Sequence, residues 1–404
     1  MRVLVLSWEY PPHVVGGLGR HVADIVPALA ELGITIHVVT PRWAGGAPQE
    51  KNGNLTVHRV EPDNEPGFDF HTGAVRTNAR LEALADKLCQ DQGIQLIHDH
   101  DWLTAFAATS LKHRHRLPLL ATIHATEQGR ARGPLGTDLQ RLINQTEWSL
   151  TYEAWRVITC SRYMADEVMG FFNTPANKID VIPNGVKAQQ FARRDGADLS
   201  RFRARYAAPD EQIVLYVGRV VAEKGLQVLV EAVPHVLREH PNTKFVVAGT
   251  GFLLPTLRLR ASELGVADRV YFTGFIPDED RDGLYRVASC AVFPSLYEPF
   301  GIVALEAMAA KVPVVVSLAG GLQEVVQHSE TGITVYPDNP DSLAWGINHT
   351  LARPDWAQQR AENAYRVVLS EYNWQRIASD TAAVYSRIIS ERAQASWQEA
   401  AGAP

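Results

Sequence analysis

The sequence contains few cysteines. Its three, Cys89, Cys160 and Cys290, lie far apart among 404 residues and match no metal-binding spacing. This usage excludes a disulfide framework and is typical of a reducing compartment such as the cytosol. No charged leader or cleavage site precedes the first apolar run, 2–6. We therefore expect a cytoplasmic protein.

Basic residues are not in excess either. Lys and Arg number 39 against 45 Asp and Glu, which gives a formal net charge of −6. This balance argues against bulk binding to nucleic acid or to an anionic membrane. The hydrophobic share of 46% and the charged share of 21% are ordinary for a globular chain. Because 404 residues exceed what one hydrophobic core usually serves, we expect two domains.

Apolar, β-branched runs alternate with helical patterns along the whole chain. This alternation predicts an α/β fold with parallel sheets covered by helices on both faces. Strands are expected in the first half at 2–7, 34–40, 94–98, 118–123, 156–160 and 178–182. Strands are expected in the second half at 213–217, 243–248, 268–273, 289–294, 312–316 and 332–335.

A turn signal and a polar stretch separate the two halves. Pro183-Asn184-Gly185 is typical of a turn, and the stretch 188–209 is polar and charged. We expect Rossmann-like domains, with a ligand cleft between them. The expected divisions are an N-terminal domain at 1–190, a C-terminal domain at 191–371, and a crossover helix with a plain tail at 372–404.

Two carboxylates lie eight positions apart after an expected strand of the second half. The apolar run 288–294 predicts a buried strand that ends just before Glu298, and Glu306 lies in the following helix. Eight helical positions span about 12 Å at most, so these carboxylates cannot share one proton or flank one bond. The amides near Phe300 and Gly301 lie at the helix N-terminus, which favours a phosphate. Hydroxyl, phosphate and hydroxyl sites in this order outline a nucleotide sugar, and the alternative is a solvated helix start.

Two further loops carry residues that favour phosphate. Gly16-Gly17-Leu18-Gly19 opens the first long helix, but about ten residues separate it from the strand, too many for a dinucleotide fingerprint. The second strand also lacks a terminal acid, so a nicotinamide enzyme is not expected. Glycines at a helix start can still let backbone amides approach a phosphate, although a turn without a ligand is the alternative.

In the second half, Arg219 and Lys224 follow the first strand. Together they can neutralise a departing diphosphate, and charge on a leaving group is greatest in the transition state. A solvated helix start is the alternative, although cations are disfavoured at a helix N-terminus.

Polar side chains follow two strands of the first half. Asp101 closes His98-Asp99-His100-Asp101 after the apolar run 94–97, and His124 follows the run 119–123. Because no supporting carboxylate cluster accompanies Asp99-x-Asp101, we expect no metal there. Asp101 is more plausible as an acceptor for a sugar hydroxyl. His124 can bond a hexose hydroxyl or carry a proton.

Weaker signals come from two turns. The first interpretation of Asn184-Gly185 and of Gly249-Thr250-Gly251 is a simple turn. The second is that their glycines leave room for a nucleotide or a sugar.

The combination of motifs resembles the two-domain (GT-B) retaining glycosyltransferases of family 4. The motifs are GGLG, HDHDW, TIHATE, VGRVVAEKG and EPFGIVALE, and they cover the chain from Ser7 to about Glu371. The stretches SWEYPPHVVGGLGRHV and TIHATEQGR are similar to glycogen-synthase-related α-1,4-glucosyltransferases. That likeness implies a UDP- or ADP-glucose donor bound by the domain at 191–371, and a glucan or oligosaccharide acceptor bound by the domain at 1–190.

The resemblance also implies roles for individual residues. The catalytic set would be His124, Asp101, Arg219, Lys224 and Glu298. The donor-binding set would be Gly17, Leu18, Asn184, Arg219, Lys224, Gly249, Gly251, Glu298, Phe300, Gly301 and Glu306. No metal or other cofactor is implied, since in such enzymes the leaving phosphate is thought to deprotonate the acceptor on the same face of the sugar.

The resemblance implies a different ligand group for each of these residues. Glu298 would bind the hexose hydroxyls and Glu306 the ribose hydroxyls. Arg219 and Lys224 would hold the diphosphate, His124 would lie at the hexose, and Asp101 would lie near the acceptor hydroxyl.

One position departs from the larger ADP-glucose family. Those starch and glycogen synthases carry a lysine two residues before the first glycine of GGL, where this chain has Val14. The contact to the donor phosphate must then come from Arg20 or from the backbone, or it is missing. The identity of the nucleotide base is therefore not decided by the sequence.

The sequence therefore predicts a retaining hexosyltransferase that builds an α-1,4-glucan. One alternative is a mannosyl- or glucosyltransferase acting on a small or lipid-linked acceptor, although no basic amphipathic helix supports the lipid version. Alternatives of other classes are a nucleotide-sugar isomerase or epimerase and a nucleotide-sugar-binding module. Whether the chain forms a homo-oligomer is left open.

Overall fold

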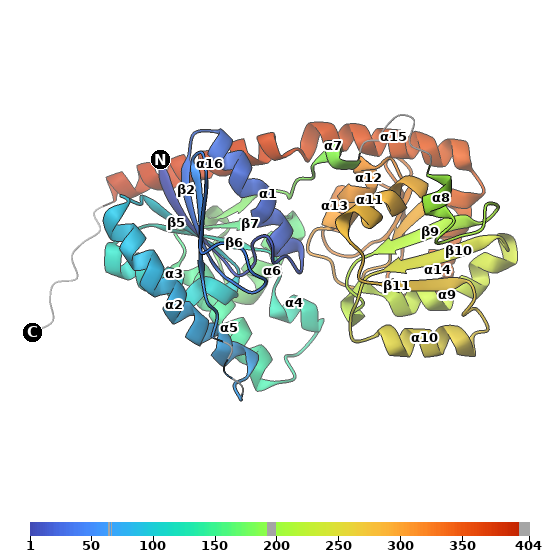
Figure 1. Cartoon of the computed structure of the whole chain (residues 1–404), viewed down its shortest axis with the longest axis horizontal. Helices are drawn as coiled ribbons and strands as arrows, with labels where there is room; N and C mark the ends of the chain where they lie inside the picture. Colours follow the sequence, from blue (N-terminus) through green and yellow to red (C-terminus); the bar gives the residue numbers. More distant parts are fainter. Residues whose placement is uncertain (64, 66, 192–198, 396–404) are drawn as a thin grey trace, which may run out of the picture. The chain divides into compact units, whose positions relative to one another are not determined.

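The computed structural model describes residues 1–63, 65, 67–191 and 199–395. It divides into two compact units, shown in Figure 1. The first unit comprises Met1–Gly185 and Trp374–Pro404, and the second comprises Val186–Asn373. Part of the polar stretch expected at the boundary (192–198) and the expected tail (398–404) lie outside the described residues.

The first unit is built on an eight-stranded sheet with the order β3-β4-β2-β1-β5-β6-β7-β8. Its strands are β1 (Arg2–Ser7), β2 (Thr35–Pro41), β3 (Gln49–Asn52), β4 (Leu55–Val60), β5 (Leu96–His100), β6 (Leu119–Ile123), β7 (Arg156–Thr159) and β8 (Ile179–Val181). All neighbours pair in parallel except β3 and β4, which form an antiparallel hairpin.

Helices cover this sheet. They are α1 (Gly17–Glu31), α2 (Phe70–Asp91), α3 (Ala105–His115), α4 (Glu127–Ala131), α5 (Asp138–Glu153), α6 (Arg162–Phe172) and the C-terminal α16 (Trp374–Gln394), with 3₁₀ turns η1 (Trp102–Thr104) and η2 (Ala176–Lys178). α1 is buried against the sheet at Val22, Ile25, Val26 and Leu29, the spacing of an amphipathic helix.

The last helix belongs to the first unit, as the sequence predicted. α16 buries Trp374, Ile377, Tyr385 and Ile388 in the same hydrophobic core as α1 and the strands β1, β2 and β5. Inside that core the Tyr385 hydroxyl contacts His98 Nδ1 at 2.7 Å. The helix therefore completes one face of the first sheet.

The second unit is built on a parallel six-stranded sheet with the order β11-β10-β9-β12-β13-β14. Its strands are β9 (Gln212–Val217), β10 (Thr243–Ala248), β11 (Val270–Gly274), β12 (Cys290–Phe293), β13 (Val314–Ser317) and β14 (Ile333–Val335). The strand order reverses between β9 and β12. In a doubly wound sheet this reversal is the place where ligands bind.

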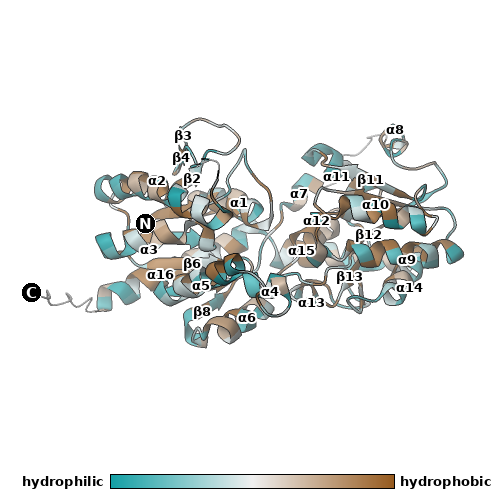
Figure 2. Ribbon diagram, turned by 90° about the horizontal axis from the view of Figure 1, so that it is seen from below, coloured by the Kyte–Doolittle hydropathy of each residue, from teal (hydrophilic) through white to brown (hydrophobic). Residues whose placement is uncertain are grey.

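The second sheet also has helices around it. They are α7 (Ala188–Phe191), α8 (Ser200–Arg203), α9 (Leu226–Glu239), α10 (Leu254–Glu263), α11 (Asp278–Val287), α12 (Ile302–Ala309), α13 (Leu322–Val325), α14 (Pro340–Leu351) and α15 (Pro354–Glu371), with the 3₁₀ turn η3 (Ala222–Lys224). Longer helices of both units carry brown and teal residues together in Figure 2, as expected where one face is buried and the other solvated. Among the described residues, no helix is both long and apolar enough to cross a membrane.

The end of β5 differs from the prediction. The strand was expected to stop at residue 98, but it continues through Asp99 to His100. Several of the polar atoms in this buried segment have partners, although Asp99 Oδ2 and His100 Nε2 have none among the described residues. His98 Nε2 contacts Thr122 Oγ1 at 2.7 Å, and Asp99 Oδ1 accepts a 2.6 Å bond from the Thr104 hydroxyl.

Candidate active site

In the second unit, the loops after β9 and β12 are joined to each other. The Glu223 carbonyl accepts hydrogen bonds from the amides of Leu296 (2.8 Å) and Tyr297 (3.1 Å). Gly225 allows this approach, since its φ is +69° and a Cβ there would lie 1.9 Å from the Pro294 carbonyl oxygen. The loops after the two switch-point strands therefore form one surface at the carboxyl edge of the sheet.

Lys224 and Glu298 meet on this surface. Lys224 Nζ lies 2.8 Å from Glu298 Oε2, and the Ser295 hydroxyl donates to the same oxygen at 3.1 Å. The side chains are 18% and 9% exposed. The pair is thus shielded from bulk water. An ion pair in such a shielded place is stronger than one at an open surface.

Glu306 lies in a separate network. Its Oε2 accepts a 3.2 Å bond from the Tyr285 hydroxyl, and its Oε1 lies 3.7 Å from Arg281 Nη1. Burial, with the Glu306 carboxylate beside it, raises the pKa of Tyr285, so the phenol remains a donor. The two carboxylates therefore have different partners.

Phe300 and Gly301 lead into the helix that carries Glu306. Gly301 is the N-cap of α12, no side chain caps this end, and its first turn contains no acidic residue. Phe300 is buried, with its ring 6.0 Å from that of Tyr372 at an edge-to-face angle. The start of α12 thus brings no acid of its own toward the positive end of the helix dipole.

Arg219 is the most exposed of the predicted cations. Its side chain is 50% exposed and Nη2 lies 3.2 Å from Glu223 Oε1. The loop after β10 packs on the same segment, because a Cβ on Gly249 would lie 1.8 Å from the Gly218 carbonyl oxygen. Gly251 continues that loop, and its carbonyl accepts from the Leu254 amide at 3.2 Å. The glycine at 249 is therefore needed for contact with neighbouring backbone.

In the first unit, Asp101 and His124 follow the neighbouring strands β5 and β6. Asp101 Oδ1 accepts a 2.7 Å bond from the His124 amide, and the Asp101 amide donates to the Thr122 carbonyl at 3.0 Å. Asp101 has φ +62°, an uncommon backbone conformation that often occurs at functional sites. Burial raises its pKa to about 7, so the carboxyl can exchange a proton near neutral pH.

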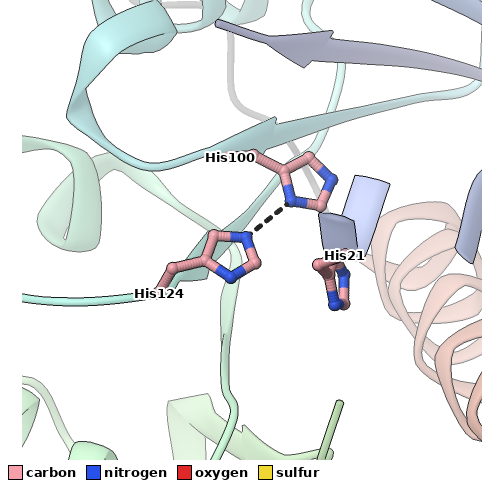
Figure 3. A group of neighbouring side chains, drawn as sticks. All are labelled: His21, His100 and His124. Atoms are coloured by element: carbon pink, nitrogen blue, oxygen red, sulfur yellow. Dashed lines mark hydrogen bonds between the residues drawn. The ribbon is translucent and has the colours of Figure 1, made fainter. Parts of the chain in front are cut away.

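His124 belongs to a cluster of histidines (Figure 3). Its Nε2 lies 3.1 Å from His100 Nδ1, and its ring centroid lies 4.8 Å from that of His21. His21 Nδ1 contacts Asn184 Oδ1 at 2.7 Å. The sequence predicted His124 and Asn184 separately, and the structure links them through His21.

The glycine loop of the first unit already contacts a carboxylate. Glu9 Oε2 accepts hydrogen bonds from the amides of Val15 (2.7 Å) and Gly16 (3.1 Å). Gly17 and Leu18 follow as the first residues of α1, where amides have no intrahelical acceptor. Glu9 therefore shapes the loop that was predicted to receive a phosphate.

Sequence reasoning missed Glu9 and one other acidic residue, Glu147. Both Glu147 oxygens accept from the Glu127 amide at 3.0 Å, and burial raises the pKa of Glu147 to about 8. A signal was available, because Glu147 shares the buried face of α5 with Ile143 and Leu150. It fixes the start of α4, the helix after His124.

The structure thus groups the predicted residues within each unit. In the first unit Asp101, His124 and Asn184 lie in one contact network. In the second unit Lys224 and Glu298 are in contact, while Glu306 has other partners.

The fold and these sites define a glycosyltransferase of the two-domain GT-B class, and comparison with known proteins supports this. The model Glycosyltransferase Family 4 matches residues 15–190, and Glycosyl transferases group 1 matches residues 200–367. The structure superimposes on sucrose-phosphate synthase from Thermosynechococcus elongatus with a TM-score of 0.81 and 25% identity, covering 96% of this chain and 99% of that chain.

Two relatives place the chain more closely. It is 39% identical to an uncharacterised glycosyltransferase of Methanocaldococcus jannaschii, over 95% of this chain and 98% of the relative. It is 36% identical to glycogen synthase of Mycobacterium tuberculosis, over 95% of this chain and 94% of the relative. The chain belongs to the family 4 glycosyltransferases. The predicted GT-B fold and transferase class are confirmed, in preference to an isomerase or a binding module.

Proposed function

We propose that this protein is a cytoplasmic retaining glucosyltransferase that moves glucose from UDP- or ADP-glucose to an α-1,4-glucan. The observation that carries the donor side is the shielded Lys224–Glu298 contact of 2.8 Å at the strand-order reversal of the second unit. A carboxylate held there beside a cation suits a donor in which sugar hydroxyls adjoin a diphosphate.

The second unit would bind the donor. Lys224 and Arg219 would hold the diphosphate, with the Phe300 and Gly301 amides between hexose and phosphate. Glu298 would accept from hexose hydroxyls, and Glu306 from the ribose. Fixed cations favour the transition state, because negative charge on the departing diphosphate is greatest there.

The first unit would contribute the remaining groups. The Gly17 and Leu18 amides would complete the phosphate site, and His124 would lie at the hexose. Asn184 would support His124 indirectly, because it contacts His21, which lies against His124. The Asp101 carboxylate would accept a hydrogen bond from the hydroxyl of the sugar that receives the glucose. The departing phosphate would take the acceptor proton on the same face of the sugar, so the reaction would need neither a protein nucleophile nor a metal.

The glucan acceptor rests on similarity rather than on a described sugar site. The 36% identity to a glycogen synthase extends over 95% of this chain. A small acceptor is the second candidate, favoured by the TM-score of 0.81 to a protein named for sucrose phosphate.

A donor and acceptor screen tests the proposal. Purified protein would be offered UDP-glucose, ADP-glucose and GDP-mannose, each with and without glycogen or maltooligosaccharides. We expect glucan-dependent release of UDP or ADP together with lengthened α-1,4 chains. Release that ignores glucan would overturn the glucan acceptor and direct the search to small acceptors.

A further inference from the structure

Three histidines from separate elements converge in the first unit. One ring nitrogen of each of His21, His100 and His124 lies within 4.8 Å of the other two. Figure 3 shows the three rings grouped around one spot, from α1, the end of β5 and the segment after β6. Within the part of the chain that the structure describes, this is the one group of three such side chains at metal-ligand spacing.

The histidines are in the protonation state that binds metal. Burial lowers the pKa of His21 to about 4 and holds the pKa of His100 and His124 well below the usual value. All three are therefore neutral at pH 7, with one nitrogen lone pair each. Metal ions bind the neutral imidazole and compete with protons for it, so no deprotonation is needed here.

Two of the nitrogens already have the spacing of ligands to one ion. His100 Nδ1 and His124 Nε2 are 3.1 Å apart and share a hydrogen bond, so a metal would replace the proton between them, which would move to the other nitrogen of its ring. Two nitrogens bound to a tetrahedral Zn²⁺ at about 2.0–2.1 Å lie about 3.3 Å from each other. The third nitrogen, within 4.8 Å of both, needs to move by about 1.5 Å or less to complete the triad.

The surroundings also suit a ligand. The contact from His21 Nδ1 to buried Asn184 Oδ1 places the ring proton on Nδ1 and leaves the Nε2 lone pair available.

We propose that His21, His100 and His124 form a binding site for a divalent transition metal ion such as Zn²⁺. Three imidazoles suit Zn²⁺, Cu²⁺ or Ni²⁺, whereas Mg²⁺ and Ca²⁺ prefer oxygen ligands. His21 and His100 are buried and His124 is partly exposed. Three protein ligands would leave a fourth position for water or hydroxide.

Metal binding does not depend on the proposed function, but its consequence does. If His124 lies at the donor hexose, an ion on His124 competes with the sugar, and Zn²⁺ is then an inhibitor. The metal would regulate transfer without taking part in it.

The first test is direct binding to the metal-stripped full-length protein, with Zn²⁺ alone in calorimetry and Co²⁺ alone in visible absorption. We expect one Zn²⁺ per chain and the visible bands of a four-coordinate Co²⁺ site. His21→Gln and His124→Gln should each weaken Zn²⁺ binding at least tenfold. Asn184→Ala should weaken it about 10–100-fold by releasing the His21 ring.

A matched control lies in the same sheet. His37 Nδ1 and His58 Nε2 are also buried and 3.1 Å apart, but they form a pair without a third histidine. His58→Gln should leave Zn²⁺ affinity unchanged, with circular dichroism confirming that every variant folds. Folded wild-type protein that binds no stoichiometric Zn²⁺, or an equal loss in His58→Gln, would overturn the site.

The outcome also separates the metal site from the proposed function. Stoichiometric Zn²⁺ binding without inhibition of transfer would keep the site and remove His124 from the donor hexose. Failure of the donor screen would leave the binding result untouched, because no sugar is present in it.

Discussion

Lys224 Nζ lies 2.8 Å from Glu298 Oε2, although the two residues are 74 positions apart in the chain. The contact exists because β9 and β12 are neighbours at the strand-order reversal, and because Gly225 lets the following loops meet. The charges are therefore placed by the topology of the sheet, at the edge where doubly wound sheets bind ligands.

Gly225 should be intolerant of a side chain. Gly225→Ala adds both the strain of φ +69° and a Cβ 1.9 Å from the Pro294 carbonyl oxygen, so the loops must separate. We expect a loss of more than about 3 kcal/mol in the free energy of unfolding, measured with urea.

Gly265 provides the control for that substitution. Its φ is +68°, yet nothing lies within 4 Å of the position of its Cβ. Gly265→Ala should therefore cost only about 1–2 kcal/mol, the penalty of the left-handed backbone alone. Equal losses for the two variants would contradict the packing role assigned to Gly225.

Glu147 should make stability fall as the pH rises. Burial raises its folded pKa from 4.5 to about 8, so the native state binds a proton that the unfolded state releases. This contribution is complete below about pH 4.5 and disappears as the pH rises through about 8. Wild type should lose up to roughly 5 kcal/mol relative to Glu147→Gln across that range, measured by denaturant unfolding at each pH.

Glu153, on the same helix, should behave in the opposite way. Although burial opposes the shift, its bonds to Lys112 and the neighbouring His113 lower the pKa of Glu153. The contribution of Glu153 to the free energy of unfolding is then present above its unfolded pKa and is lost in acid.

The prediction for Glu147 has its own contradicting outcome. If Glu147→Gln left the pH profile of stability unchanged, Glu147 would be ionised in the folded protein.

The docking of α16 should depend on one buried hydroxyl. Tyr385→Phe removes the 2.7 Å partner of His98 Nδ1 and should cost about 1–3 kcal/mol of unfolding free energy. Ser386→Ala, one position along on an exposed face, should be nearly neutral. Similar effects of the two changes, measured by thermal or urea unfolding, would contradict the importance of this contact.

Much of the fold followed from hydrophobic patterning, and the exceptions have physical causes. The apolar runs located the core strands other than β4, because parallel strands are buried on both faces. Both strands of the hairpin were missed. Gln49–Asn52 (β3) is polar and exposed, and Leu55–Val60 (β4) is buried but carries Thr56, His58 and Arg59, so neither forms an apolar run. The end of β5 was misplaced because His98 and Asp99 find partners from Tyr385, Thr122 and Thr104, which no local pattern reveals.

The candidate site was predictable only in part for the same reason. Glu298 and Lys224 follow strand ends and are recognisable one by one, but their contact depends on strand order. Glu9 and the triad of His21, His100 and His124 depend on tertiary neighbours that the sequence does not mark. Three histidines on three elements show no spacing motif.

The most direct measurement is the rate of nucleotide release, as kcat/KM, with glycogen and either UDP-glucose or ADP-glucose. The variants are Lys224→Met and Lys311→Met; Lys311 pairs at 2.9 Å with Glu362 at an exposed place in the same unit. We predict that wild type and Lys311→Met turn over alike, and that Lys224→Met loses about 10²–10³-fold. Wild-type rates in Lys224→Met, or no release by the wild type with either donor, would contradict the account.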